Sequence, residues 1–391
     1  MTEIGGPAKA PPAAGRTRLY FGPWYQKSPF FEATRRAGCS AYDIYNHMYH
    51  PNSYGDPEEE YQALINDVTL WDVAVERIVE ISGPDATELT NMLTCRDLTK
   101  CDVKQCKYML VTAPDGGIVN DPVLLRIEEN KWWMALSDSD AGLYALGVAA
   151  ESGLNAEVTH PEVYPVQVQG PKSKETMRDL FGDWVLDMKY YWCEETDLDG
   201  IPVVISRTGW TAVVGYEIYL RDPSRGDDLW EKILEAGKPH NIRVTPSSDI
   251  RRIEAGIYDY GSDLSIDTNP FEAMGLERLV EEQEADYIGK DALERIRREG
   301  VTRKIVGIEI EGDPQGQPPD HLPAFSGGER VGYVTDIAYS PRLEKNIGYV
   351  WVPIDLAEPG NELAVESPQG TLKGKTASVP FIDPKKKVPA Q

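Results

Sequence analysis

The spacing of apolar residues predicts most of the elements in the first half of the chain. The run ERIVEISG (76–83) predicts a strand, and PDATELTNMLT (84–94) carries apolar residues at helical spacing behind a proline. Three further apolar runs predict a meander of strands: YMLVT (108–112), IVNDPVLLRI (118–127) and WWMALS (132–137). The Asp-Gly-Gly signal between the first two of these runs predicts a hairpin turn.

Two more strand runs and two helical segments precede a region rich in β-structure. IPVVISRT (201–208) and GYEIYL (215–220) predict a second strand pair, while residues 172–182 and 224–236 predict helices. After about residue 300, short apolar runs are separated by Pro/Gly loops, which is typical of a small barrel or sandwich. The whole pattern predicts an α+β fold with a C-terminal β domain.

Composition narrows the class of protein. The 391 residues carry 64 acidic and 40 basic side chains, a formal net charge of −24, which argues against nucleic acid or an anionic membrane as a partner. Residues 1–17 are rich in Pro, Ala and Gly and predict a disordered tail, not a signal peptide. Because no apolar run could cross a bilayer and the five cysteines include no CxxC pair, we expect a cytoplasmic protein with reduced thiols.

Common cofactor and metal signatures are absent from the sequence. There is no GxGxxG run after a strand, no GxxxxGK(S/T) loop, no GxSxG and no HExxH. Cys95, Cys101 and Cys106 match no zinc spacing, and His47 and His50 have no acidic neighbour that completes a ligand set. We therefore expect no metal site, and we interpret these residues as structural or as lining a substrate pocket.

The segment GGIVNDP (116–122) is the most informative part of the chain. If Ile118 begins a strand, Asp121 falls among apolar residues on one face of it. Pro122 cannot donate to a β-ladder, so the strand must lie at an edge or break at this point. A carboxylate held at such an irregularity can receive the N–H groups of a ligand while partly desolvated. The alternative is an aspartate that completes the hairpin by bonding local backbone, and the segment alone leaves both interpretations open.

Seven segments, in order, resemble the aminomethyltransferase (glycine-cleavage T-protein) family. They are LWDVAVERIVEISGPDA, GGIVNDP with Tyr108 thirteen residues before its aspartate, VQGPKS, SRTGWTAVVGYEIYL, RRIEAG, YIGKDAL and GYVTDIAYSPRLEKNIGYV. The resemblance runs from about residue 60 to the end of the sequence and implies a three-lobed folate-binding fold. The implied domains are residues 18–65 with 157–275, residues 66–156 with 276–300, and a C-terminal β-barrel domain at 301–391.

The same resemblance implies tetrahydrofolate as cofactor and suggests which residues bind it. Asp121 would meet the N5/N10 side of the pterin, with Tyr108 beside it, and these two are the expected catalytic residues. Glu217 would accept hydrogen bonds from the pterin amino group and ring N–H. Trp210 would line the cavity, and Arg252 would face the glutamate tail of the cofactor. Without the family order, Glu217, Trp210 and Arg252 fit a strand-surface charge, a core aromatic and a helix-surface ion pair.

Departures from the glycine-cleavage pattern favour a demethylase branch. GWTAVVGYE (209–217) stands where that enzyme usually reads GYTGEDGFE, and YNHMYHP (45–51) is unlike its GWEMPVQY type of segment. WDVAVER (71–77) and the NDP triplet are similar to the dimethylsulfoniopropionate demethylase branch. This likeness implies methyl transfer from a small-molecule donor, dimethylsulfoniopropionate or a related onium compound, to N5 of tetrahydrofolate. It argues against a lipoylated carrier protein as partner.

The donor pocket and the rival functions are less constrained by the sequence. Trp24, Tyr45, His47 and Trp192 are the expected donor contacts, because aromatic rings can form a cation–π cage. One alternative is an O-demethylase of a methoxylated aromatic acid, which needs a proton donor such as Tyr42, Tyr45 or His47. The other two are glycine cleavage itself and a non-enzymatic folate-binding iron–sulfur assembly factor, whose KGCYxGQE-like loop is not found here.

Overall fold

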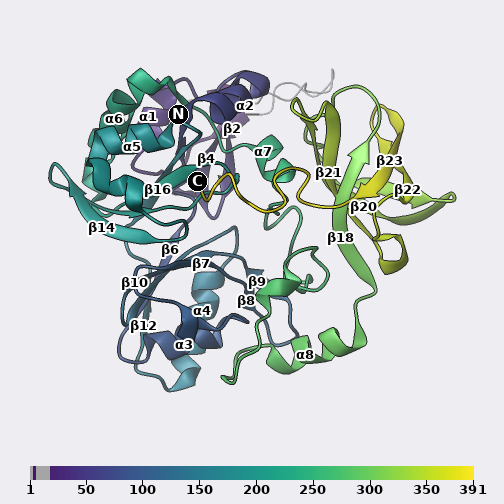
Figure 1. Cartoon of the computed structure of the whole chain (residues 1–391), viewed down its shortest axis with the longest axis horizontal. Helices are drawn as coiled ribbons and strands as arrows, with labels where there is room; N and C mark the ends of the chain where they lie inside the picture. The colour runs from purple at the N-terminus through teal and green to yellow at the C-terminus, as the bar shows by residue number, and fades with distance from the viewer. Residues whose placement is uncertain (1–2, 6–17) are drawn as a thin grey trace.

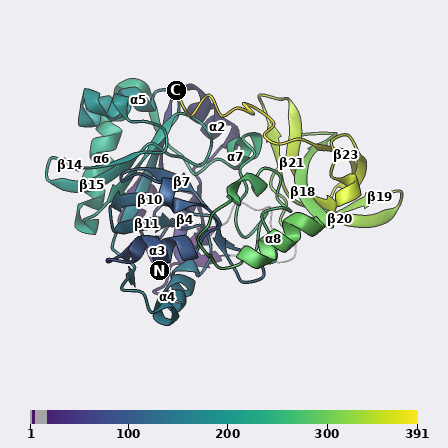
Figure 2. The ribbon, with the colours of Figure 1, turned by 60° about the horizontal axis from the view of Figure 1, so that its bottom comes forward.

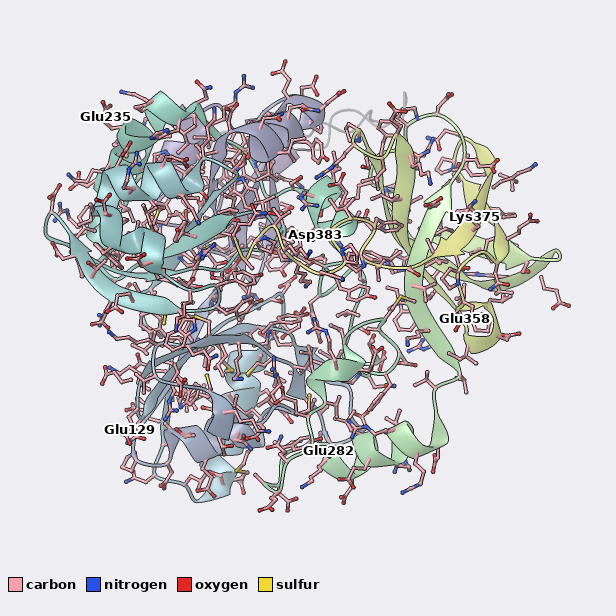
Figure 3. All side chains as sticks on the ribbon, in the orientation of Figure 1. Glu129, Glu235, Glu282, Glu358, Lys375 and Asp383 are labelled. Atoms are coloured by element: carbon pink, nitrogen blue, oxygen red, sulfur yellow. The ribbon has the colours of Figure 1, made fainter. Side chains whose placement is uncertain are left out.

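The chain forms three lobes, as the computed structural model of residues 3–5 and 18–391 shows (Figure 1; Figure 2). One lobe contains a six-stranded sheet, the second a five-stranded sheet, and the third a closed six-stranded barrel. The predicted α+β class with a C-terminal β-barrel is confirmed, and the barrel is favoured over the sandwich. Acidic side chains such as Glu129, Glu235, Glu282 and Glu358 project from the edges of the lobes, in line with the net charge of −24 (Figure 3).

The first lobe packs helices against a six-stranded sheet. In spatial order the strands are β14 (Cys193–Leu198), β15 (Ile201–Ser206), β16 (Gly215–Leu220), β13 (Tyr164–Gln169), β5 (Val68–Asp72) and β17 (Ile242–Val244). The helices are α1 (Phe31–Arg36), α2 (Pro57–Asn66), α5 (Ser173–Phe181) and α6 (Gly226–Gly237), and a hairpin joins β3 (Ala41–Tyr45) to β4 (Met48–Ser53). Leu229, Trp230 and Ile233 share one face of α6 and are buried in the core of this lobe, which holds the helix in place.

The second lobe is built on a five-stranded antiparallel sheet. Its strands in spatial order are β12 (Glu157–Thr159), β6 (Ile78–Ser82), β11 (Lys131–Ala135), β10 (Val123–Glu128) and β7 (Cys106–Tyr108). Helices α3 (Ala86–Met92) and α4 (Ala141–Ser152) complete it, together with a small hairpin of β8 (Val111–Thr112) and β9 (Ile118–Asn120). The hairpin turn predicted at Asp-Gly-Gly is confirmed by the pairing of β8 with β9.

The third lobe is the barrel, and two helices connect it to the others. Its strands in spatial order are β18 (Arg303–Ile310), β21 (Lys345–Pro353), β20 (Glu329–Ser340), β19 (Leu322–Ser326), β22 (Glu362–Ser367) and β23 (Gly370–Ala377). Helix α8 (Lys290–Glu299) precedes the barrel, and α7 (Asp249–Glu254) contacts β20 and β21. In Figure 1, α7 lies between the first lobe and the barrel.

The run over 118–127 breaks at Asp121–Pro122, one of the two outcomes that Pro122 allowed, and its halves β9 and β10 belong to different sheets because proline cannot continue the ladder. The domain boundaries predicted at 66 and 157 are a few residues early, since β5 pairs with β13 in the first lobe and β12 pairs with β6 in the second.

The predicted disordered tail, residues 1–17, lies largely outside the described residues. Of these positions the structure describes Glu3–Gly5, which form β1 and pair antiparallel with β2 (Arg18–Tyr20).

Candidate functional site

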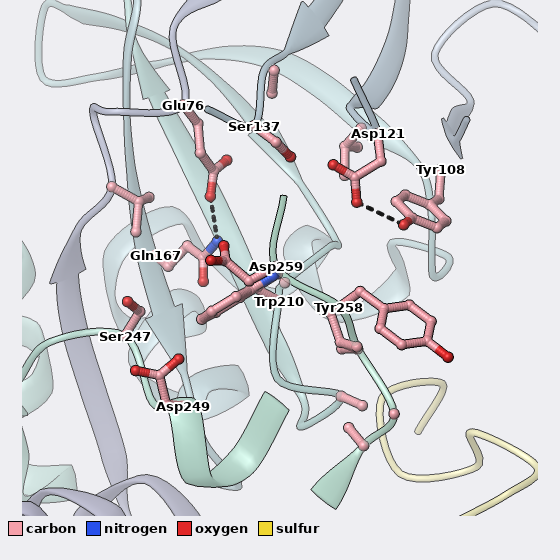
Figure 4. A pocket seen from close by; sticks show the side chains of 18 of the residues that line it. Glu76, Tyr108, Asp121, Ser137, Gln167, Trp210, Ser247, Asp249, Tyr258 and Asp259 are labelled. Atoms are coloured by element: carbon pink, nitrogen blue, oxygen red, sulfur yellow. Dashed lines mark hydrogen bonds between the residues drawn. The ribbon is translucent and has the colours of Figure 1, made fainter. Parts of the chain in front are cut away.

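A cavity of about 570 Å³ lies where the three lobes meet, a volume suited to a small-molecule ligand. Its walls come from the β3–β4 hairpin, the link between β5 and β6, the end of β7, the β9–β10 break, strands β13 and β16, and residues 246–259. Met274–Arg278 and the segment 379–386 close it from the barrel side. Residues from distant parts of the sequence therefore line one cavity (Figure 4).

Asp121 faces this cavity because the chain leaves one sheet and enters another beside it. Asn120 is fully buried and fixes the break: its amide nitrogen donates to the Ser137 carbonyl at 2.9 Å, and the Ser137 N–H donates back at 3.1 Å. Tyr108, the last residue of β7, lies opposite Val123 in the ladder, and its hydroxyl donates to Asp121 Oδ2 at 2.8 Å. The structure thus brings the two expected catalytic residues into direct contact.

Burial governs the ionisation of Asp121. The side chain is 7% exposed, and desolvation raises the pKa of its carboxyl from 3.8 to about 6, although the hydroxyls of Ser137 and Tyr108 act in the opposite direction. Its Oδ1 completes no hydrogen bond with any described residue. A buried carboxylate oxygen without a donor suits a ligand N–H, and a pKa near neutrality suits proton transfer.

Glu217 lies on β16 in a pocket of hydrogen-bond donors. It is 2% exposed and accepts from Tyr219 Oη at 2.5 Å, Thr208 Oγ1 at 2.7 Å, Gln167 Nε2 at 2.8 Å and Ser206 Oγ at 3.3 Å. Gln167 and Ser206 are its direct neighbours on strands β13 and β15. Desolvation raises the pKa of Glu217 in spite of these four donors. The interpretation of this residue as a strand-surface charge is excluded by its burial.

Sequence reasoning missed two neighbours of Glu217. The Gln167 amide donates to both Glu217 and Glu76, the latter at 3.2 Å, and so bridges the buried Glu217 carboxylate and the partly buried Glu76 carboxylate. Burial and the negative charge of Glu217 raise the pKa of Glu76 well above its usual value. The Gln167 Oε1 is buried and has no partner among the described residues. Glu76 lies within the WDVAVER segment, so that segment was the available signal; nothing local indicated Gln167.

Acidic and aromatic side chains form a further part of the wall. Trp210, Tyr258, Asp249 and Asp259 all line the cavity. Burial raises the pKa of Asp259 to about 7, with Arg252 acting against this shift. Figure 4 shows the Trp210 ring and Asp259 in the middle of the site, between Gln167 and Tyr258. This wall offers negative charge and aromatic faces to a cationic group.

Arg252 does not line the cavity, contrary to its expected contact with the glutamate tail. It is fully buried and bonds Asp249 at 2.8 Å, Asp263 at 2.7 Å and Asp336 of β20. Its guanidinium carbon lies 5.5 Å from the centre of the Trp210 ring. Its donors are directed to carboxylates of the protein, so it supports the wall from behind.

Of the four expected donor contacts, the structure brings one to the cavity. Tyr45 lines it next to His50, with 6.2 Å between the ring centres. The other three lie outside the lining: Trp24 is 75% exposed, His47 bonds Asp140 at 3.2 Å on the surface, and Trp192 lies under the Lys189 ammonium. The neighbours of Trp192 do reach the cavity, since Tyr190 and Tyr191 both line it. A positive φ at Tyr191 and the bridge from Trp192 to Gln105 turn the two adjacent side chains in different directions.

The acceptor groups of the cavity suit the reduced pterin that the sequence implies. Asp121 Oδ1 and Gln167 Oε1 are buried acceptors that receive no hydrogen bond from any residue the structure describes, and Glu76 and Glu217 add carboxylate oxygens. A reduced pterin presents an amino group and several N–H groups, so its donors match this set.

Within residues 3–5 and 18–391, no group of three His, Cys, Asp or Glu is arranged to hold a metal ion, and all five cysteines are free. No helix of the described chain is long and apolar enough to cross a membrane.

Comparisons with known proteins agree with this arrangement. Residues 30–284 match the GCVT N-terminal domain, and residues 303–383 match the glycine cleavage T-protein C-terminal barrel domain. The chain is 33% identical to a dimethylsulfoniopropionate demethylase from Ruegeria pomeroyi, over 88% of this chain and 94% of that protein. It is 30% identical to an aminomethyltransferase from Halothermothrix orenii, over 91% of this chain and all of that protein (100%).

A solved structure supports the fold. The glycine cleavage system aminomethyltransferase T from Bartonella henselae superimposes with a TM-score of 0.82, covering 91% of this chain and 98% of that one at 22% identity. Together, the two domain matches and the relatives at 30% identity or more show that this chain belongs to the glycine-cleavage T-protein (aminomethyltransferase) family, whose members are tetrahydrofolate-dependent methyl and aminomethyl transferases.

Proposed function

We propose that this enzyme removes a methyl group from a small donor that carries a cationic onium group and transfers it to N5 of tetrahydrofolate, giving 5-methyltetrahydrofolate. Dimethylsulfoniopropionate or a similar onium compound is the proposed donor. The observation that carries the proposal is one cavity that holds the Asp121–Tyr108 pair, acceptors for a pterin, and an acidic and aromatic wall. The 33% identity to a dimethylsulfoniopropionate demethylase supports the same choice.

The residues of the cavity suit a direct displacement at a methyl carbon. Tetrahydrofolate, when bound, supplies N5 as the nucleophile. Asp121, held by Tyr108, orients the N5–H group and accepts its proton as the N–CH₃ bond forms. The S–CH₃ bond breaks in the same step, and its electron pair stays on sulfur. A sulfonium therefore leaves as a neutral thioether, so the protein needs no acid on that side.

The wall around Trp210 is the proposed site of the cationic donor. Asp249 supplies negative charge there, Asp259 adds to it once its carboxyl, with a pKa of about 7, is ionised, and Trp210 and Tyr258 supply aromatic faces. A cation held against such faces is stabilised by about 0.5–2 kcal/mol, the upper value applying when it is desolvated. Since Trp24 and Trp192 lie outside the lining, this wall replaces the cage first expected from the sequence.

An aromatic methyl ether fits this cavity less well. Its phenolate leaving group would need a proton donor, and two of the three candidates, Tyr42 and His47, do not line the cavity. Tyr42 is instead buried in a cluster with Phe31 and Tyr49. The third, Tyr45, lines the cavity, but burial raises the pKa of its hydroxyl well above the usual value, which weakens it as an acid.

Aminomethyl transfer, as in glycine cleavage, is the second candidate. Its support is the 30% identity to an aminomethyltransferase over the full length of that protein. The two reactions give different folate products, 5-methyl in one case and 5,10-methylene in the other. The folate product therefore distinguishes methyl transfer from aminomethyl transfer, whatever the rates of the two reactions.

The test is a donor screen with tetrahydrofolate in excess. Dimethylsulfoniopropionate, vanillate, syringate and an aminomethylated lipoyl carrier are compared in parallel, and the folate product is identified by mass. We expect 5-methyltetrahydrofolate from the sulfonium and no product from the ethers. Methylene product from the carrier, with an inert sulfonium, would establish the second candidate instead. Turnover of an ether alone would contradict the proposal of a sulfonium donor, but it would still support a tetrahydrofolate-dependent demethylase.

A further inference from the structure

The β3–β4 hairpin places a histidine–aspartate pair in the cavity wall, and the proposed displacement uses neither residue. Asp43 and His50 are direct neighbours across the two strands, so their side chains lie on the same face of the hairpin. The preceding residues, Tyr42 and Tyr49, point to the other face and are buried with Phe31. Asp43 and His50 both line the cavity, so the hairpin presents this pair to a ligand.

Hydrogen bonds fix the orientation of the imidazole ring. His50 Nδ1 lies 3.1 Å from Asp43 Oδ1, and Asp43 Oδ2 accepts from Asn52 Nδ2 at 2.8 Å. Because a carboxylate oxygen accepts, Nδ1 carries the hydrogen, and both oxygens of Asp43 are occupied. His50 Nε2, on the far side of the ring, makes no hydrogen bond with any residue the structure describes. The His50 side chain is 14% exposed and lines the cavity, so Nε2 is the atom of the pair that is left for a ligand.

Three carboxylates favour the positively charged form of His50. Burial alone would lower the pKa of the ring, but Asp43 on β3, Asp72 on β5 and Asp249 on α7 together raise it above the ordinary value of 6.5. In the charged form the ring donates from both nitrogens. The other basic residues among the described lining belong to the chain before α8 and to the segment 379–386: Arg278, Lys385 and Lys386. His50 is therefore the cation that the hairpin supplies.

This cation lies beside the proposed site of the onium group. Asp249 acts electrostatically on His50 and belongs, with Trp210, to the wall proposed to hold that group. Figure 4 shows Trp210 in the middle of the site and Asp249 on the side away from Asp121 and Tyr108. A donor whose methyl group faces Asp121 and whose onium centre lies at Trp210 therefore extends towards Asp249 and His50.

We propose that His50, held by Asp43, binds the carboxylate of a zwitterionic methyl donor, so that the site selects zwitterions over onium compounds without an acid group. The inference rests on the proposed function and deepens it, because it names the class of onium compound. The Nε2–H of an imidazolium donates a charge-assisted hydrogen bond to a carboxylate, while Asp249 and Trp210 face the onium centre. Asp43 acts through the ring and is a positioning residue.

A matched pair of donors tests this inference in the unmodified enzyme. Dimethylsulfoniopropionate is compared with dimethyl(isopentyl)sulfonium, which has an isopropyl group in place of the carboxylate, and 5-methyltetrahydrofolate is measured for both. We expect kcat/KM to be about tenfold higher for the zwitterion, the scale of one charge-assisted hydrogen bond. This preference should decline as the pH rises through the raised pKa of His50, because the neutral ring has lost its charge.

The two ways of failing are distinguishable in this experiment. Equal kcat/KM values for the two sulfoniums would overturn the carboxylate subsite and leave the proposed demethylase intact. No 5-methyltetrahydrofolate from either sulfonium would overturn the proposed function and this inference with it.

The variant His50→Gln keeps an N–H donor and removes the positive charge. Its preference for the zwitterion should fall from about tenfold to near one, mainly through a higher KM for dimethylsulfoniopropionate. The control is His321→Gln, because His321 stacks on Tyr333 of the barrel, outside the cavity lining, and this variant should keep the preference. A lower Tm for His50→Gln with an unchanged preference would overturn the inference, since the pair would then only stabilise the hairpin.

The variant Asp43→Asn tests the positioning role. Without the Asp43 charge the pKa of His50 should fall, so the preference for the zwitterion should be lost at lower pH than in the unmodified enzyme. A pH dependence of the preference identical to that of the unmodified enzyme would contradict the role of Asp43 in holding and charging the ring.

Discussion

At the scale of single residues, the chemistry depends on how the protein surrounds Asp121. Burial raises the pKa of its carboxyl to about 6, while the Tyr108 hydroxyl donates to the ionised form and opposes that shift. The carboxylate is thus mostly ionised near neutral pH. Its pKa also lies close enough to neutral pH for it to act as an effective proton acceptor. The burial of Asp121 costs folding stability, but it also makes the carboxylate suitable as a proton acceptor.

Replacing Asp121 by asparagine should abolish most turnover and keep the fold. The expected loss in kcat is about 10²–10⁴-fold, the usual contribution of a positioned base. In the unmodified enzyme, kcat/KM should rise with pH through about 6, because the ionised carboxylate is the active form. Activity of Asp121→Asn within threefold of the unmodified enzyme would reduce this residue to a structural one.

The Tyr108→Phe variant tests the pair from the other side. It removes a donor that stabilises the ionised carboxylate, so the pKa of Asp121 should rise further and the acidic limb of kcat/KM should move to higher pH. Lower activity with an unmoved limb would mean that Tyr108 acts on the ligand and not through Asp121.

Replacing Glu217 by glutamine should weaken folate binding more than it slows the reaction of bound substrate. The variant loses the charged acceptor to which Thr208 and Tyr219 donate in the protein. We expect the Kd for tetrahydrofolate to rise about 10- to 100-fold. Glu366→Gln, on an exposed position of the barrel, is the control. An unchanged Kd for Glu217→Gln, measured by calorimetry, would remove this residue from the pterin site.

Whether a residue belongs to the site could be predicted from the sequence only where the neighbouring residues determine its environment. Asp121 carried a local signal, the strand-breaking proline beside it, whereas Glu217 was assigned only through the family resemblance. Arg252, Trp24 and Trp192 carried no such signal, because their surroundings come from other elements: Asp336 of the barrel satisfies Arg252, and Lys104 and Arg207 bond the backbone around Trp192. Gln167 and Lys386 were missed for the same reason, since only the folded chain brings them to the cavity.

At the scale of elements, the break between β9 and β10 positions the site. The β8–β9 hairpin leaves the five-stranded sheet and packs on the 260–268 segment, where the Ile118 N–H donates to the Thr268 carbonyl at 2.8 Å. The sequence predicted both strands and the turn. It did not predict that they belong to different sheets, because pairing partners distant in sequence decide that.

Gly117 tests how closely this hairpin must approach its neighbour. A Cβ at Gly117 would lie 2.1 Å from the Ile266 carbonyl oxygen, so Gly117→Ala should lower Tm by several degrees through a forced backbone shift. The control is Gly147→Ala in helix α4, where nothing lies within 4 Å of the added carbon. That change should stabilise the protein by about 0.5–1 kcal/mol. A Tm for Gly117→Ala equal to or above that of the parent would contradict the close packing.

At the scale of the whole molecule, the cavity exists because the three lobes are held in fixed positions relative to one another. Arg252 connects helix α7 with the barrel and with the linking segment, since it bonds Asp336 of the barrel strand β20 and Asp263 of that segment. All three side chains are buried, so the network cannot exchange its partners for water. The family resemblance predicted the three lobes, whereas the residues that tie them together emerged only from their contacts.

Removing this connection should destabilise the enzyme without a specific loss of folate affinity. Arg252→Met leaves two buried carboxylates without their partner, and breaking such a network typically costs about 3–5 kcal/mol. We expect a clearly lower urea midpoint and, for the molecules that remain folded at low temperature, a Kd for tetrahydrofolate close to that of the parent. A normal urea midpoint with a selective loss of affinity for tetrahydrofolate over tetrahydropteroate would instead return Arg252 to the glutamate tail.

Direct methyl transfer to N5 is the central claim, and a labelled single turnover tests it most directly. Dimethylsulfoniopropionate with fully deuterated S-methyl groups is mixed with excess enzyme and tetrahydrofolate, and the folate product is analysed by mass spectrometry. Displacement assisted by Asp121 predicts 5-methyltetrahydrofolate that retains all of the methyl deuterium, together with a stoichiometric thioether. A methylene-folate product, or a methyl product that has lost deuterium, would contradict direct transfer.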